Sequence, residues 1–253
     1  MKKWLAAALC TAAAMSASSA LAANINFVTA GTSSTFYPIS ATVCQLWNDS
    51  IEGMRATATP SGGGIDNLNQ ALDGEAQIGI ANANLVYQAQ QGTDSFEGYA
   101  NENLRIFAGL YYNPNQVVVT RDSGIETLED LVGKHISVGA AGSTTVDEAT
   151  VHLALLGKTL DDLKAEYMGT SESADAMSNK QLDGVWIMAG MTTAAVTEMC
   201  STANGKLVGM DDELIAKVQA KYPWYSKFTI PAGTYDGQTE PVQTTAVKML
   251  LLT

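Results

Sequence analysis

Histidine and cysteine are scarce in this sequence, which leaves little basis for metal or hydrolytic chemistry. The 253 residues include two histidines and three cysteines. His135 stands before an expected strand and His152 within an expected helix, and neither has a cysteine or carboxylate at a metal-ligand spacing. Serines are plentiful, but a serine nucleophile needs a positioned base, and no Gly-x-Ser-x-Gly elbow or Gly-Lys-Ser/Thr phosphate loop occurs. We therefore expect no metal site, no cofactor and no enzymatic activity.

Positive charge and long apolar runs are also sparse. Lysine and arginine number 14 against 26 aspartates and glutamates, which gives a formal net charge of −12. Nucleic acid and anionic lipid surfaces are poor partners for such a chain. Beyond residue 23 no apolar run is long enough to cross a bilayer, so we expect no membrane insertion of the mature protein.

The N-terminus carries an export signal. Lys2 and Lys3 precede an alanine- and leucine-rich segment that is too short to span a bilayer and ends in an Ala-x-Ala pattern. This arrangement predicts a secretory signal peptide over residues 1–23. Cys10 follows Leu9, where a lipoprotein cleavage site would need a small residue, so we expect no lipid anchor.

Removal of the leader leaves two cysteines, Cys44 and Cys200, in different halves of the chain. An oxidising compartment would allow them to pair. A cross-link between parts that must move apart would hinder the motion, so the favoured interpretation is two separate buried thiols.

Four stretches of small or polar residues each follow an expected strand and open an expected helix. They are residues 31–35, 61–64, 82–84 and 139–145. Such loops leave the N–H groups of the first helical turn free, with the positive end of the helix dipole behind them, which suits an anion. One such loop is an ordinary helix cap or a flexible turn. The repetition, with three successive glycines in the second loop, favours a ligand site.

Loops of this kind gather at the carboxyl ends of the strands in an open α/β sheet, where ligands bind. We predict an α/β fold of two lobes with a ligand cleft between them: residues 24–115 form lobe 1, residues 116–244 form lobe 2, and the chain returns to lobe 1 at about 245–253. The crossovers near Gln116–Thr120 and Thr244–Leu252 should absorb closure of the lobes. The final apolar strand is expected to lack a covering element, as if the natural protein were longer.

The mature chain's cations lie outside the four loops, so an anion would be held by hydroxyls and backbone N–H groups. Tyr37 and Trp186 are expected to border its carbon chain. The ligand-binding candidates are Thr32, Ser33, Ser34, Thr35, Tyr37, Ser61, Gly62, Gly63, Asn82, Asn84, Gly142, Ser143, Thr144, Ala189 and Gly190.

The order and sequence of these loops are similar to those of one family. The motifs are Gly31–Pro38, Ser61–Leu68, Asp122–Ile125, Asp130–Lys134, Val138–Ser143, Ala189–Gly190 and Ile230–Tyr235. From about Ile25 to the last residue, the chain resembles the TAXI class of solute-binding receptors of tripartite ATP-independent periplasmic (TRAP) transporters. The resemblance implies a two-lobed, type II-like periplasmic-binding-protein fold in the periplasm. It further implies closure on a small carboxylate, such as a C4–C5 dicarboxylate, 2-oxoglutarate or glutamate, which a TRAP membrane permease then receives. A periplasmic receptor that signals to a membrane sensor kinase is the alternative left open.

The sequence departs from the family pattern in two loops. Ser33 and Ser34 stand where the family usually has glycines, and Asn82-Ala83-Asn84 stands where it usually has Gln-Ser-Asp. An amide in place of a carboxylate at Asn84 removes a negative charge that would hold an ammonium group. This difference favours a keto acid or dicarboxylate over an α-amino acid.

Overall fold

The computed structural model describes residues 23–32 and 34–253. The predictions for the signal peptide, for Cys10 and for Ser33 as a ligand-binding residue lie outside the described residues. Within them, no helix is long and apolar enough to cross a membrane.

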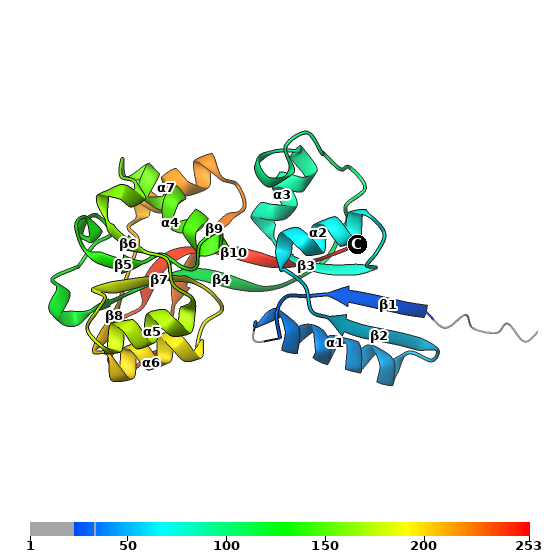
Figure 1. The fold of residues 1–253 in the computed structure, drawn as a ribbon, viewed down its shortest axis with the longest axis horizontal. Coiled ribbons are helices and arrows are strands. Elements are labelled where there is room, and N and C mark those ends of the chain that lie inside the picture. Colours follow the sequence, from blue (N-terminus) through cyan, green and yellow to red (C-terminus); the bar gives the residue numbers. More distant parts are fainter. Residues whose placement is uncertain (1–22, 33) are drawn as a thin grey trace, which may run out of the picture.

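A ten-stranded sheet runs through the protein in the order β2-β1-β3-β10-β4-β7-β5-β6, with β8 paired to β4 and β9 paired to β10. Two long antiparallel strands, β4 (Ile106–Thr120) and β10 (Val242–Leu252), pass through both of its halves (Figure 1). Their pairing joins two groups of elements into two lobes.

The first lobe contains β1 (Ala23–Val28), β2 (Met54–Thr59) and β3 (Ile78–Asn82), with helices α1 (Phe36–Ser50), α2 (Gly64–Leu72) and α3 (Ala83–Gln91) and the short 3₁₀ helix η1 (Asp94–Phe96). Helices cover both faces of this part of the sheet, with α1 below it and α2 and α3 above it in Figure 1. β1 pairs in parallel with β2 and with β3. Because parallel strands end at the same edge, the loops that follow these three strands gather on one side of the lobe.

The second lobe repeats this plan. It contains β5 (His135–Ser137), β6 (Lys164–Glu166), β7 (Gly184–Met188), β8 (Gly205–Val208) and β9 (Tyr225–Ile230), with helices α4 (Thr144–Leu155), α5 (Thr170–Ser178), α6 (Ala194–Thr202) and α7 (Asp212–Lys221) and the 3₁₀ helices η2 (Arg121–Ser123), η3 (Glu129–Leu131) and η4 (Leu160–Asp162). β5 pairs in parallel with β6 and β7. The loops that follow β5 and β7 therefore also share an edge.

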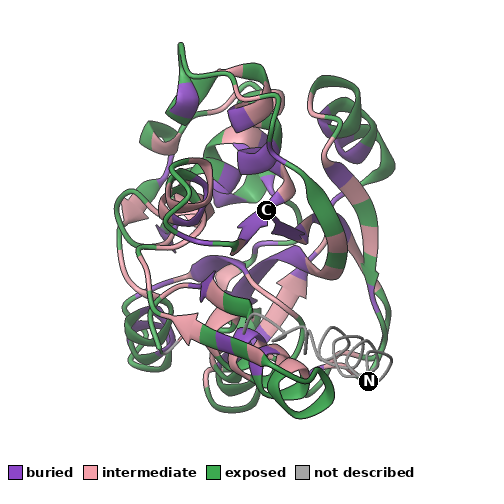
Figure 2. Cartoon of the chain, turned by 90° about the vertical axis from the view of Figure 1, so that its right-hand side faces the viewer, coloured by how far each residue is buried: buried purple, intermediate pink, exposed green. Residues whose placement is uncertain are grey.

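The hydrophobic cores lie on the two faces of the sheet in each lobe, and buried residues concentrate on the strands (Figure 2). In the first lobe, Leu68 and Leu85 pack on one face and Phe27 and Cys44 on the other. The second lobe has a larger core around Trp186.

The expectation that the final strand is uncovered is wrong. β10 lies inside the sheet between β3 and β4, and its residues Ala246, Val247, Met249, Leu251 and Leu252 are buried. Helices of the two lobes cover its faces, so the apolar sequence reflects a central strand.

The crossover expected near Gln116–Thr120 is the second half of β4, where Gln116–Val119 pair with β7, and the strand continues back to Ile106. Its part in lobe closure stays a prediction. The structure also differs from two local sequence patterns. The segment Thr127–Gly133 has the leucine spacing of a short helix but forms only the 3₁₀ turn η3. Leu46 has the helical spacing of the apolar residues of α1, but it is 58% exposed.

Cys44 and Cys200 are both free and buried, as predicted. Burial raises the pKa of the Cys44 thiol and raises that of Cys200 to about 11. Both thiols therefore stay protonated at neutral pH and act as small apolar side chains.

Candidate functional site

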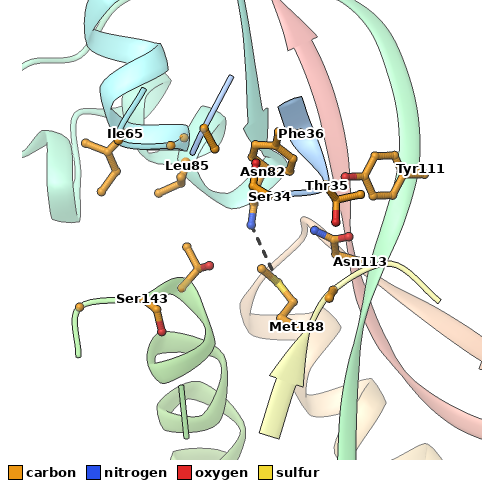
Figure 3. A pocket seen from close by; sticks show the side chains of 17 residues that line it. Ser34, Thr35, Phe36, Ile65, Asn82, Leu85, Tyr111, Asn113, Ser143 and Met188 are labelled. Atoms are coloured by element: carbon orange, nitrogen blue, oxygen red, sulfur yellow. Dashed lines mark hydrogen bonds between the residues drawn. The ribbon is translucent and has the colours of Figure 1, made fainter. Parts of the chain in front are cut away.

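A cavity of about 350 Å³ lies where the carboxyl ends of β1, β2 and β3 face the start of α4 and the end of β7 (Figure 3). Its wall includes Ser34 and Gly62 from the first lobe and Ser143 and Met188 from the second. A volume of this size falls in the range of small-molecule sites. Among the described residues that line it, none carries a charged side chain.

Four helices begin at this cavity. Their N-cap residues are Thr35 for α1, Gly63 for α2, Asn82 for α3 and Ser143 for α4, and all four line the wall. None of these caps accepts a backbone hydrogen bond through its side chain within the described chain. α5 and α6, which begin away from the cavity, also lack such a bond, whereas the cap of α7, Asp211, accepts a backbone N–H at 2.7 Å. The cavity thus receives first-turn N–H donors and the positive ends of four helix dipoles.

Several polar side chains at the cavity are buried without a hydrogen-bond partner in the described part of the protein. They are the hydroxyls of Ser34, Tyr111 and Ser143 and the Oδ1 atom of Asn113. Burial raises the pKa of Tyr111 to about 12, so its phenol stays neutral and keeps its proton for donation. An unpaired buried polar group costs about 1–3 kcal/mol, so a ligand that pairs with these atoms would recover part of that cost.

The rest of the wall is apolar. Phe36, Ile65, Leu85 and Met188 face the cavity in Figure 3. A Cβ atom at Gly64 would lie 2.6 Å from Leu85 Cδ1, so a side chain there would have to displace the end of the Leu85 side chain from the cavity wall. The donors and the apolar side chains together suit a small anion with a short carbon chain.

Asn67 of α2 links three segments at this edge: the ends of two strands and one loop. Its Nδ2 donates to the carbonyl oxygens of Thr29 at 2.5 Å and Ile80 at 2.7 Å, and its Oδ1 accepts from Ser61 Oγ at 2.6 Å. Ser61 Oγ in turn accepts the N–H of Gly63 at 3.1 Å. The fully buried Asn67 therefore ties the ends of β1 and β3 to the triglycine loop.

A second network holds the loop after β7. Gln116 of β4 donates through Nε2 to the carbonyl of Ala189 at 2.9 Å, and its Oε1 accepts the hydroxyl of Tyr235. The Tyr235 oxygen accepts the N–H of Thr192 at 2.9 Å. Gln116 and Tyr235 are buried, so they fix the path of the chain where it borders the cavity.

Residues 27–253 match the model of the NMT1-like family. The chain belongs to the NMT1-like family.

Solved structures with a similar fold are periplasmic binding proteins. The aliphatic sulphonate binding protein of Escherichia coli is 16% identical with a TM-score of 0.52, over 74% of this chain and 56% of that one. A putative sulfonate-binding protein of Methylobacillus flagellatus KT is 14% identical with a TM-score of 0.52, over 91% of this chain and 62% of that one. The NMT1-like chain therefore spans little more than half the length of these neighbours, and the likeness shows the fold. The predicted two-lobed α/β fold is confirmed.

Nine of the sequence-predicted residues of this NMT1-like protein line the cavity: Ser34, Thr35, Gly62, Gly63, Asn82, Gly142, Ser143, Thr144 and Ala189. The fold brings them together because each stands at the end of a strand or at the start of a helix. Their contact with a ligand stays a prediction.

Other predicted residues lie elsewhere. Thr32 is exposed, Tyr37 is half-buried, and neither lines the cavity. Ser61 lies behind the wall, where its hydroxyl serves Asn67. Gly190 lines a neighbouring hollow. Each of these positions is one or two residues from a residue that does line the cavity.

Asn84 and Trp186, two further residues expected at the ligand, are buried and do not line the cavity. Asn84 is buried within α3 and does not line the cavity, so it gives no geometric support to the argument about an ammonium group. Trp186 is fully buried in the second lobe's core, where its Nε1 donates to Asn115 Oδ1 at 2.8 Å. Met188, two residues further along β7, reaches the cavity instead.

Sequence reasoning missed the contribution of β4. Tyr111 and Asn113 both line the cavity, although they lie in the middle of the chain's longest strand. Their alternation in Tyr-x-Asn, two polar groups on one face of an apolar strand, was the available signal.

Proposed function

We propose that this protein is a periplasmic receptor that captures a small carboxylate between its lobes and delivers it to a TRAP membrane permease. The observation that carries the proposal is the convergence of four helix starts and several unpartnered polar atoms on one cavity without charged side chains. A carboxylate accepts several N–H and O–H bonds at once, which is what this wall offers. The assignment to a TRAP system rests on the motif resemblance.

The preferred ligand is a C4–C5 dicarboxylate or 2-oxoglutarate, ahead of glutamate. An α-ammonium group needs an acidic partner, and none of the described residues that line the cavity is acidic. Asn84 does not line the cavity, but Asn82 does, and its amide side chain is also neutral. Backbone N–H groups from both lobes would hold the two ends of the acid.

Lobe closure around the ligand is the proposed mechanism. The cavity's donors come from α1, α2 and α3 of one lobe and from α4 of the other, so a bound acid gains its full set of bonds only when the lobes are together. Some direct contacts between the lobes exist at this edge: Asn82 Nδ2 lies 3.9 Å from Met188 Sδ, the rings of Tyr87 and Trp224 lie 5.0 Å apart, and Ala83 packs against the second lobe's core. A bound acid would add its own bonds to these contacts and so favour closure.

Thermal denaturation in the presence of candidate ligands tests the ligand class. At 100 times its dissociation constant, a bound acid should add about 2.7 kcal/mol to the free energy of unfolding. We expect stabilisation by 2-oxoglutarate or C4 dicarboxylates and none by sugars or cations. Stabilisation by glutamate or glutamine alone would overturn the preference for a keto acid but keep the carboxylate receptor. Stabilisation by sugars or cations alone would overturn both.

The transport role has its own test in the gene neighbourhood. We expect a neighbouring gene for a permease with fused membrane subunits. A lone gene for a sensor kinase in that place would contradict transport and favour sensing.

A further inference from the structure

A second hollow, of about 740 Å³, lies beside the ligand cavity and is open to solvent. Its wall is formed by Ile39 of α1, Tyr112 of β4, Met191 after β7 and Phe228 of β9. The rings of Tyr112 and Phe228 lie 5.8 Å apart at an angle of 46°. The side chain of Met191 is 39% exposed in the loop at its edge.

The two spaces are adjacent. Thr35 and Tyr111 line both of them. Gly190 borders the junction: a Cβ atom there would lie 3.6 Å from Tyr111 Cε2 and 3.8 Å from Asn113 Oδ1. The absence of a side chain at this glycine leaves the edge of the Tyr111 ring uncovered on the side of the hollow.

The chemistry of the hollow differs from that of the cavity. Its two threonine hydroxyls away from the cavity are already bonded, since Thr192 Oγ1 donates to the carbonyl of Met191 and Thr234 Oγ1 to that of Pro231, both at 2.7 Å. The N–H of Thr192 is taken by Tyr235. Among the described residues, the unpartnered hydroxyls of Ser34 and Ser143 and the Asn113 Oδ1 atom line the cavity alone, whereas the hollow has a larger share of bonded polar groups and apolar side chains.

We propose that the hollow is a second subsite, which holds a hydrocarbon arm of the same carboxylate whose head group lies in the first cavity. The inference rests on the proposed carboxylate function. The first cavity alone has the volume that a C4–C5 acid needs, so an arm that passes beside Tyr111 into the adjacent hollow would extend the ligand range to acids with an aromatic or branched arm. Burial of that arm against Tyr112, Phe228 and Met191 supplies the additional affinity.

A pair of 2-oxo acids with the same head tests the subsite. Calorimetric titration should give a dissociation constant for 2-oxo-4-phenylbutanoate about 10-fold or more below that for 2-oxobutanoate, because the phenyl arm buries apolar surface. Met191→Asn should reduce this ratio, since it replaces an apolar wall by a polar one. Ile51→Asn is the matched control: Ile51 is 46% exposed, ends α1 and lines neither space, so the ratio should stay as in the wild type.

The outcomes separate the subsite from the function. Equal affinities for the two acids, or a ratio that Met191→Asn leaves unchanged, would overturn the subsite. Binding of 2-oxoglutarate without binding of the phenyl acid would overturn it as well, while the carboxylate receptor would stand. If none of the three acids binds, the proposed function fails together with the subsite.

Discussion

Replacement of Ser143 by aspartate should lower the affinity for an anionic ligand by about 100-fold or more while the protein stays folded. Ser143 caps α4 and lines the cavity, and its hydroxyl has no partner among the described residues. Aspartate is a good N-cap, so the helix keeps its start. The new carboxylate would occupy the N–H groups meant for the ligand and would repel it, since like charges about 4 Å apart repel by about 4 kcal/mol in a partly buried setting.

Two variants control for this result. Ser143→Asn keeps a capping side chain of the same shape without the charge and should bind within a few-fold of the wild type. Gly169→Asp places the same charge at the start of α5, where a side chain has room and does not line the cavity, and should leave affinity unchanged. Titration calorimetry gives the affinities, and melting temperatures check the fold. Wild-type affinity in Ser143→Asp would contradict an anion site at α4.

The second large effect concerns a buried network behind the cavity in the second lobe. Glu148 of α4 is fully buried and accepts the Asn115 Nδ2 donor at 2.7 Å. His152, one turn later, has Nδ1 2.6 Å from the carbonyl oxygen of Glu148 and Nε2 2.7 Å from Thr245 Oγ1. Because a carbonyl only accepts, Nδ1 carries a proton. Burial lowers the pKa of His152 to about 4, which keeps the imidazole neutral near pH 6. Both ionisable side chains are therefore uncharged in the folded protein near pH 6.

Their titrations should have opposite effects on stability. Burial raises the pKa of Glu148 from 4.5 to about 7, so the folded state holds a proton that the unfolded state releases, and stability falls as pH rises through this window. Burial lowers the pKa of His152 from 6.5 to about 4, so stability rises with pH in that window. Where the two windows overlap the slopes cancel, so these two groups leave stability nearly constant.

The variant Glu148→Gln should expose the histidine's contribution. Without the glutamate, the free energy of unfolding should rise by up to about 1.4 kcal/mol per pH unit between the folded-state and the unfolded-state pKa of His152, about 4 and 6.5. Urea denaturation of the variant and the wild type at matched pH values measures how the free energy of unfolding of each protein changes with pH. A wild-type slope as steep as that of the variant would contradict the cancellation.

Sequence patterns predicted the parts of this fold that carry strong local signals. The glycine-rich loops and the apolar strands β1, β3, β7 and β10 were recognisable, because central strands are apolar and helix starts need small residues. The short strands β6, β8 and β9 and the helix α5 were missed. α5 reads Thr-Ser-Glu-Ser-Ala-Asp-Ala-Met-Ser, and its few apolar residues obtain their packing only from tertiary contacts with α6 and β7.

The candidate site, too, could be predicted only in part. Its loops could be predicted because the carboxyl ends of parallel strands must share an edge, and the structure brings nine of the predicted residues to one cavity. Tyr111 and Asn113 could not be placed, because their position depends on where β4 passes between the lobes. The directions of individual side chains could not be predicted either: Ser61 bonds to Asn67, Asn84 is buried within α3, and neither lines the cavity.

Small-angle scattering tests the central claim, that a carboxylate bridges the two lobes, most directly. The protein is measured alone and with a saturating concentration of the acid that stabilises it against heat, and Ser143→Asp serves as the control that should not respond. We predict that the acid lowers the radius of gyration of the wild type as the lobes close. An unchanged scattering profile with an acid that demonstrably binds would contradict capture by closure.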